Sequence, residues 1–177
     1  MLDLLRHLAA RGHGIGLHGS YDTYRNPSLL TAERQRLQDA CEAAGLRTEV
    51  MANRQHFLRW RAEETPDHLE QAGFETDASG GFSDLAGFRF GTSREFPMWS
   101  WRERRGLSLR QRPLVMMEGS VHQHMGLGPG SEALTVMLGL RERSRAFGGN
   151  FEMLWHNSNL QSEPERKQFL ALLEESR

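Results

Sequence analysis

The chain has 177 residues, with 22 lysines and arginines against 23 aspartates and glutamates, so its formal net charge is −1. That length suits one domain, and the near-zero charge excludes a strong attraction to nucleic acid or to an anionic membrane. Cys41 is the only cysteine, which excludes an internal disulfide. No apolar run approaches the roughly 18 residues that span a bilayer, and the first residues lack a signal-peptide pattern. We therefore expect a globular cytoplasmic protein.

The first part of the chain predicts a helix, a strand and a second helix. A short apolar stripe predicts a helix that ends near Gly12, and the short strand after it leads to His18. Residues 19–27 read as a loop. Apolar side chains at helical spacing then predict a helix over residues 28–44, which ends at Gly45.

The middle of the chain continues the alternation. We expect a strand over residues 47–52, a helix from Thr65 to about Gly73, and a strand over residues 74–77. Thr65 is the expected N-cap of this helix, and Pro66 suits its first helical position. Residues 79–93 contain four glycines and predict an irregular loop.

The last part predicts two more strands and two helices. We expect a strand over 107–117, a helix over 131–147, a strand over 151–155 and a final helix over 164–175. Ser162 is the expected cap of this final helix, and Phe169, Leu172 and Leu173 are expected to face inward. Repeated strand–helix units predict an α/β fold with a parallel sheet, either open or closed as a barrel. In both cases a functional site is expected at the carboxyl ends of the strands.

Polar side chains follow four of these predicted strands. Imidazole and carboxylate groups brought to one sheet edge would supply nitrogen and oxygen ligands for a divalent metal, with an arginine to balance a carboxylate. Any one of them alone is more often a turn or capping residue. The set comprises His18, Asp22, Arg54, His56, Asp77 and His156.

Several short segments carry a family resemblance. They are GHGIGLHGSY (residues 12–21), RQHF (54–57), GFETD (73–77) and LWH (154–156). In order and spacing these segments resemble the second and later motifs of polysaccharide deacetylases of the NodB-homology type, a carbohydrate esterase family, over about residues 1–160. GFRFGT (87–92) is similar to a segment of a subgroup linked to surface-polysaccharide biosynthesis.

The resemblance implies a distorted (β/α) barrel and metal-dependent hydrolysis of an N- or O-acetyl group from a sugar in a polysaccharide or its precursor. It implies that a divalent cation, with zinc the expected one, is held by His18, Asp22 and His56. It also implies that His156 is a general acid, with Arg54 and Asp77 as the supporting pair of this acid or of the base. Phe57 and Trp155 are the expected substrate contacts, although Trp155 is equally well explained as a core residue.

Two departures from the family pattern matter. Asp22 stands where the family has a second metal-binding histidine, and the chain contains no Asp-Asp pair such as the first motif supplies. We therefore expect a single deacetylase-like domain over residues 1–177 that is N-terminally incomplete and lacks the first strand of the barrel. The alternative is a degenerate relative, a non-catalytic carbohydrate-binding or scaffold module.

These expectations also name partners. They are an acetylated carbohydrate and, across the strand edge that a missing first strand would expose, a possible second copy of the chain. No nucleic acid and no membrane span are expected. The His122-x-His124 pair reads as part of a solvated loop, and the arginines near Trp99 and Trp101 read as an exposed basic rim. An unrelated hydrolase using Ser20 or Ser93 has little support, because neither serine lies in a Gly-x-Ser-x-Gly turn.

Overall fold

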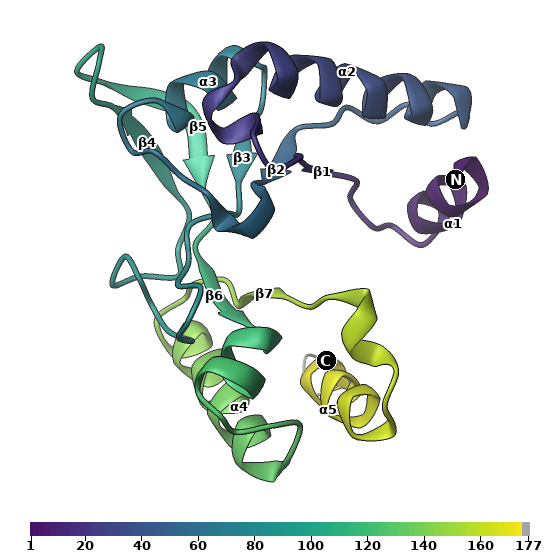
Figure 1. The fold of residues 1–177 in the computed structure, drawn as a ribbon, viewed down its shortest axis with the longest axis vertical. Coiled ribbons are helices and arrows are strands. Elements are labelled where there is room, and N and C mark those ends of the chain that lie inside the picture. The colour runs from purple at the N-terminus through teal and green to yellow at the C-terminus, as the bar shows by residue number, and fades with distance from the viewer. Residues whose placement is uncertain (175–177) are drawn as a thin grey trace. The chain divides into compact units, whose positions relative to one another are not determined.

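The computed structural model describes residues 1–174 and divides into two compact units (Figure 1). Unit 1 comprises residues 1–79 and 96–111, and unit 2 comprises residues 80–95 and the chain from residue 112 onward. The chain therefore passes from unit 1 to unit 2 and back before it completes unit 2. The single deacetylase-like domain stays a prediction.

Unit 1 is built on a five-stranded sheet in the order β1-β2-β3-β5-β4. The first four strands in that order run parallel, and the edge strand β4 runs antiparallel to β5. Their bounds are Leu17–His18 (β1), Ala52–Arg54 (β2), Thr76–Asp77 (β3), Phe96–Ser100 (β4) and Arg105–Gln111 (β5). The register places Leu17, Asn53, Asp77 and Gln111 in one row across the sheet. Polar side chains on neighbouring strands are thereby brought side by side.

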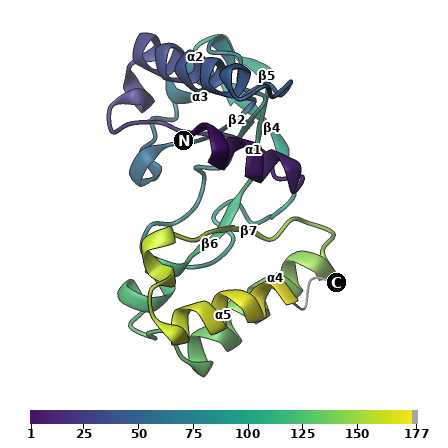
Figure 2. The same cartoon turned by 90° about the vertical axis from the view of Figure 1, so that its right-hand side faces the viewer.

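Three helices complete unit 1: α1 (Leu2–Ala10), α2 (Pro27–Ala43) and α3 (Thr65–Gln71). The side chain of Asn26 caps α2 by accepting a hydrogen bond from the backbone N–H of Leu29 at 3.0 Å. Beyond the end of this helix, Gly45 has a φ of +77°, a conformation that glycine adopts without Cβ strain. α2 and α3 lie side by side (Figure 2). The core of the unit includes the fully buried Leu30, Cys41, Val50, Leu69 and Leu109.

Unit 2 is a strand–helix–strand unit with one further helix. Strands β6 (Leu114–Met117) and β7 (Glu152–Leu154) are parallel, and the long helix α4 (Ser131–Ala146) connects them. The final helix α5 (Glu163–Glu174) contacts α4. Its N-terminus is a capping box, because Ser162 and Glu165 hydrogen-bond each other's backbone N–H. The core of the unit includes the buried Val115, Met116, Val121, Met137 and Leu172.

The α/β class and the mostly parallel sheet are confirmed, whereas the barrel stays a prediction. The single strand expected over 107–117 is wrong, because it forms β5 in unit 1 and β6 in unit 2. Pro113 lies in the gap between them and cannot donate a backbone hydrogen bond to a ladder. The strand expected over 47–52 lies mostly outside β2, which begins at Ala52.

Two smaller differences concern the edge strand and the C-terminus. Strand β4 was not predicted. Its Pro97 is tolerated because β4 is an edge strand. Leu173, expected to face inward, is 44% exposed. The predicted end of the last helix, Glu175, lies outside the described residues. No helix within residues 1–174 combines the length and the apolar character that crossing a membrane requires.

Candidate functional site

In unit 1, two histidines meet where β1 and β2 end. His18 is the last residue of β1, and His56 follows the end of β2 in the short 3-10 turn η2 (His56–Leu58). Nε2 of His18 lies 3.1 Å from Nδ1 of His56, and the two ring centroids are 5.2 Å apart. The predicted convergence of these two side chains is therefore observed. It follows from the parallel pairing of β1 with β2, which brings both carboxyl ends to one edge.

The two facing nitrogens suit two positions on one cation. Ring nitrogens bound to the same tetrahedral zinc, each at about 2.0–2.1 Å, lie about 3.4 Å from each other. The observed 3.1 Å between Nε2 of His18 and Nδ1 of His56 is close to that separation. Without a cation the same geometry allows one ring to donate a hydrogen bond to the other. The pair therefore fits two of the three predicted ligands.

The third predicted ligand, Asp22, is engaged by arginines. Its Oδ1 lies 2.8 Å from Nη2 of Arg25 and 3.9 Å from Nη1 of Arg59; the nearer contact is an ion pair without hydrogen-bond alignment. Within residues 1–174 there is no group of three His, Cys, Asp or Glu side chains placed to hold one metal ion. The metal site with His18, Asp22 and His56 as its full ligand set stays a prediction.

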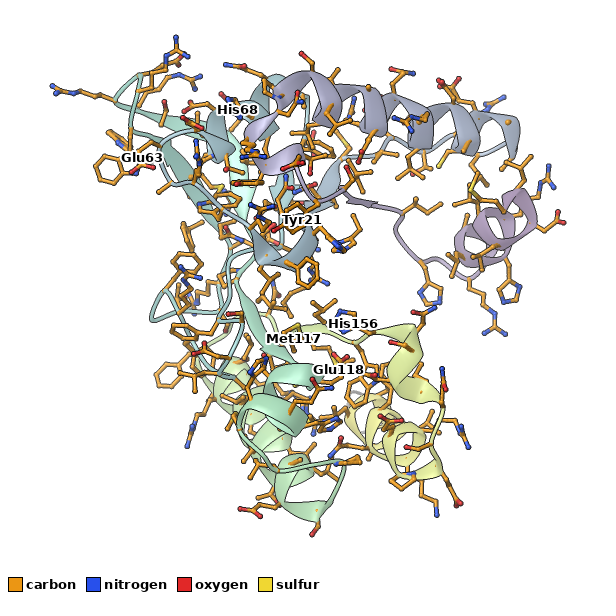
Figure 3. The ribbon with its side chains drawn as sticks, viewed as in Figure 1. Tyr21, Glu63, His68, Met117, Glu118 and His156 are labelled. Carbon is orange, nitrogen blue, oxygen red and sulfur yellow. The ribbon has the colours of Figure 1, made fainter. Side chains whose placement is uncertain are left out.

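Exposed aromatic rings flank the histidine pair. Phe57 is 73% exposed, and its ring centroid lies 4.5 Å from that of His56 and 6.1 Å from that of Tyr21. Phe57 and Leu58 have φ values of 55° and 52°, which cost about 1–3 kcal/mol for each non-glycine residue. This strained turn presents the Phe57 ring to solvent beside His56, an arrangement compatible with the predicted substrate contact. Figure 3 shows Tyr21 in the same region.

Asp77, predicted to support catalysis, is completely buried. Its Oδ1 accepts hydrogen bonds from Nδ2 of Asn53 at 2.8 Å and Oγ of Ser79 at 2.7 Å. Its Oδ2 accepts from the backbone N–H of Ser79 at 2.8 Å and from Nε2 of Gln111 at 3.4 Å. Burial raises the pKa of the Asp77 carboxyl, against the hydrogen bonds from Ser79, Asn53 and Gln111, which lower it. Any part it takes in catalysis acts through these neighbours.

Arg54 bridges two strands of the same sheet. It is the last residue of β2, and its Nε donates a hydrogen bond of 3.0 Å to the carbonyl oxygen of Ala78, the residue after Asp77. The predicted support pair thus comes from neighbouring strand ends. Its role in catalysis stays a prediction.

In unit 2, His156 meets a carboxylate that sequence reasoning missed. Glu118 directly follows β6 and is fully buried, whereas the side chain of His156, two residues after β7, is 49% exposed. Oε1 of Glu118 accepts hydrogen bonds from Nδ1 of His156 at 2.6 Å, from the backbone N–H of His156 at 3.1 Å and from Nδ2 of Asn159 at 2.7 Å. Figure 3 shows both side chains at the ends of the two neighbouring strands.

This contact determines what the His156 ring can do. When Glu118 accepts from Nδ1–H, the neutral ring is held in the tautomer whose Nε2 accepts a proton. The carboxylate also offsets the positive charge that the ring carries during a proton transfer. The arrangement is that of a proton-transfer dyad with one buried and one solvent-facing partner.

A sequence signal for Glu118 does exist. It is the one acidic residue that directly follows the apolar run Leu-Val-Met-Met at residues 114–117, and charged residues at the carboxyl ends of parallel strands are frequent in sites. The signal was hidden because 107–117 was read as one strand with no functional residue after it. Oε2 of Glu118 has no hydrogen-bond partner among residues 1–174.

Trp155, which precedes His156, packs within unit 2. Its Nε1 donates a hydrogen bond of 2.9 Å to the carbonyl oxygen of Asn159, and its ring centroid lies 5.2 Å from that of Phe169 and 5.8 Å from that of His122. The packing role weighed for Trp155 is therefore observed, and the side chain is half-buried. Its contact with substrate stays a prediction.

His122 also differs from its expected place in a solvated loop. It lies in a single π-helical turn, η3 (Ser120–His124), and its Nε2 lies 2.5 Å from Oε1 of Gln168 on α5. This contact ties η3 to α5. His124 is exposed.

No family model matches the sequence, and no curated protein matches it. The resemblance to polysaccharide deacetylases therefore rests on the motifs alone. The geometry of each unit is independent of that resemblance. It places His18 with His56, and His156 with Glu118.

Proposed function

We propose that the chain hydrolyses an acetyl group from an N- or O-acetylated sugar of a polysaccharide or its precursor. The observation that carries the proposal is the buried Glu118 carboxylate on Nδ1 of the half-exposed His156. The motif resemblance supplies the substrate class, and the His18–His56 pair is the second support. The proposal includes the distorted (β/α) barrel, of which the parallel order β1-β2-β3-β5 would supply consecutive strands.

In this proposal, His156 acts as the general acid. In the hydrolysis, water adds to the acetyl carbon, the bond from that carbon to the sugar nitrogen or oxygen breaks, and the departing atom takes a proton. Protonated Nε2 of His156 gives that proton, while Glu118 fixes the ring through Nδ1. Such a positioned acid contributes about 10²- to 10⁴-fold in rate.

In this proposal, His18 and His56 are ligands of the cation. The 3.1 Å between Nε2 of His18 and Nδ1 of His56 is close to the spacing of two nitrogen ligands on one cation. A divalent cation held there would lower the pKa of its bound water. Asp22 joins them only if its carboxylate leaves Arg25, with which it now forms an ion pair.

The exposed ring of Phe57 has the part of a substrate contact. Its neighbour His56 and the ring of Tyr21 lie within 4.5 and 6.1 Å of it, centroid to centroid. Aromatic rings offer a flat apolar surface. A sugar face that stacks there would lie beside His56.

Acetate release tests the proposal. The full chain would be assayed with N-acetylated chitooligosaccharides and with O-acetylated xylan, each with added zinc or cobalt. We expect release by the natural chain and a loss of about 100-fold or more in His156→Ala, whereas His124→Ala, an exposed histidine of the same unit, stays active. Absence of release from both substrates with either metal would contradict the proposal.

Cobalt binding tests the histidine pair separately. Cobalt(II) bound by nitrogen ligands has a visible absorption spectrum, so binding can be followed without activity. We expect His18→Ala and His56→Ala to abolish the spectrum and His13→Ala, an exposed histidine outside the pair, to retain it. A spectrum unchanged in His18→Ala would remove the pair from the proposal. Glycan binding without metal or acetate release would establish the non-catalytic module instead.

A further inference from the structure

Unit 2 contains a cavity that the proposed chemistry does not use. It has a volume of about 480 Å³, within the range of small-molecule sites. Its lining combines two aromatic rings, Phe88 and Phe147, with two guanidinium groups, Arg94 and Arg143, around the backbone of residues 91–93. Neither Glu118 nor His156 is among the lining residues.

The cavity is held together by contacts between two segments distant in sequence. Nε of Arg94 donates a hydrogen bond of 2.8 Å to the carbonyl oxygen of Phe147, and the backbone N–H of Asn150 donates one of 3.0 Å to the carbonyl oxygen of Ser93. A Cβ at position 149 would collide with Oγ of Ser93, so Gly149 is required for this close approach. The walls are therefore fixed before any ligand enters.

The charge of the cavity is positive. No acidic residue lines it within the described chain. The nearest carboxylates in sequence are engaged by other arginines: Glu95 lies 2.6 Å from Arg112, and Glu142 lies 3.4 Å from both Arg141 and Arg145. Arg143 is exposed and forms no ion pair with a residue in 1–174. Its guanidinium is thus available to a carboxylate or a phosphate, for which its planar geometry is suited.

The aromatic walls add a second requirement for the ligand. Phe147 follows the last residue of α4 and is 77% exposed, a large apolar ring left in water beside the two arginines. Phe88 is half-buried on the opposite segment. A ligand that fits both features carries an anionic group on a ring with an apolar face.

We propose that this cavity binds an acidic sugar, meaning a pyranose ring that bears a carboxylate or a phosphate. The choice of a sugar as the ring rests on the proposed function, whereas the anion and the flat face come from the cavity itself. Arg143 pairs with the anionic group, and Phe147 contacts the ring. The cavity therefore selects charged over neutral segments of a glycan.

Calorimetric titration of the full chain tests this. The probes are D-glucuronate, glucose 1-phosphate, neutral glucose and inorganic phosphate. We expect at least one of the two acidic sugars to bind about tenfold or more tightly than glucose and than phosphate, and the better of them identifies the anionic group. Arg143→Ala is expected to weaken that binding by about tenfold or more, and Phe147→Ala to weaken it too. Arg145→Ala, on the same helix but outside the lining, is the matched control.

Three results would overturn the inference: glucose binding as tightly as the acidic sugars, phosphate alone binding as tightly as both of them, or Arg143→Ala and Arg145→Ala behaving alike. The titration is repeated on His156→Ala, which retains the cavity. Acidic-sugar binding that depends on Arg143, in a chain that releases no acetate, leaves this inference standing and removes the proposed function. Acetate release without such binding would remove this inference and leave the proposed function standing.

Discussion

Each unit of the molecule buries one carboxylate completely at the end of a strand, and the two carboxylates differ in their hydrogen-bond partners. Asp77 in unit 1 receives hydrogen bonds on both oxygens, from Asn53, Ser79 and Gln111. Glu118 in unit 2 receives all of its hydrogen bonds on Oε1, from His156 and Asn159, while Oε2 has no partner within residues 1–174. Burial alone therefore does not distinguish them; their partners do.

The difference separates a carboxylate that joins strands inside the sheet from one that contacts an exposed imidazole ring. The partners of Asp77 are two amide side chains and a serine inside the sheet, so its hydrogen bonds hold neighbouring strands in register. The main partner of Glu118 is the imidazole of His156, which is about half exposed. Glu118 is therefore linked to the surface through that one ring. We expect substitution of Asp77 to affect stability and substitution of Glu118 to affect acetate release.

Glu118→Gln gives the largest expected effect. Glutamine keeps the size of the side chain but removes the charge that orients and compensates His156, so acetate release should fall by about 100-fold or more. The melting temperature, followed by circular dichroism, should stay close to that of the natural chain. Glu132→Gln, an exposed residue of α4, is the control. A Glu118→Gln variant with a clearly lowered melting temperature and unchanged acetate release would reverse the roles assigned to the two carboxylates.

Asp77→Ala gives the largest expected effect on stability. It leaves Nδ2 of Asn53 and Oγ of Ser79 without this acceptor inside the sheet, which costs about 1–3 kcal/mol for each donor in the free energy of unfolding. Nε2 of Gln111 still donates to the backbone carbonyl of residue 77. Urea denaturation measures this loss. Asp84→Ala, an exposed aspartate, should cost less than about 0.5 kcal/mol. Equal midpoints for the two variants would contradict a structural role for Asp77.

Asn159→Ala sharpens the comparison within unit 2. It removes one neutral donor from Oε1 of Glu118 and leaves the contact with His156 in place. Loss of one such hydrogen bond is worth about 1 kcal/mol, so acetate release should fall by about fivefold. The measurement is kcat with saturating substrate. A decrease as large as that of Glu118→Gln would show that Asn159, and not the charge, orients the pair.

A third carboxylate, Glu70 on α3, provides the smallest expected effect, through pH. Burial acts to raise the pKa of Glu70, but hydrogen bonds from Arg105 and Ser108 outweigh it and lower the pKa below its ordinary 4.5. Because the folded pKa is the lower one, the stabilisation is present above about pH 4.5 and is lost as the pH falls through the folded value.

Glu70→Gln should therefore lower the melting temperature by a few degrees at pH 7, a modest effect because its partner Arg105 is about half exposed. The difference from the natural chain should shrink as the pH falls below 4.5 and through the lower folded pKa. A difference that grows as the pH falls would show that the carboxyl is not stabilised by these donors.

Local signals in the sequence predicted the extent of the helices well, although the N-cap of α3 is Glu64 and not the expected Thr65. Gly12, Gly45 and Gly73 each follow a helix, and each has a positive φ, which is the conformation that the end of these helices requires. The apolar spacing and the Ser162 cap placed the remaining helices within a few residues. These features depend on neighbours in sequence, so they are readable without a structure.

Pairing between segments that are distant in sequence was harder to predict. The break at Pro113 was missed because the apolar pattern continues on both sides of it, and the strand β4 was missed because an edge position is a property of the sheet. Of the candidate site, the meeting of His18 with His56 was predicted from strand order. The pairing of Glu118 with His156 was not, since β6 and β7 are separated by the whole of α4.

The turn at Phe57 and Leu58 has a consequence for anyone who engineers this chain. Leu58 occupies a backbone conformation that glycine adopts freely, so Leu58→Gly would release stored strain and a screen for heat tolerance would tend to select it. The same change would loosen the aim of the neighbouring imidazole, His56. Heat tolerance and a fixed orientation of the His56 ring are therefore opposed at this turn. A variant selected there for a higher melting temperature would hold that ring less firmly.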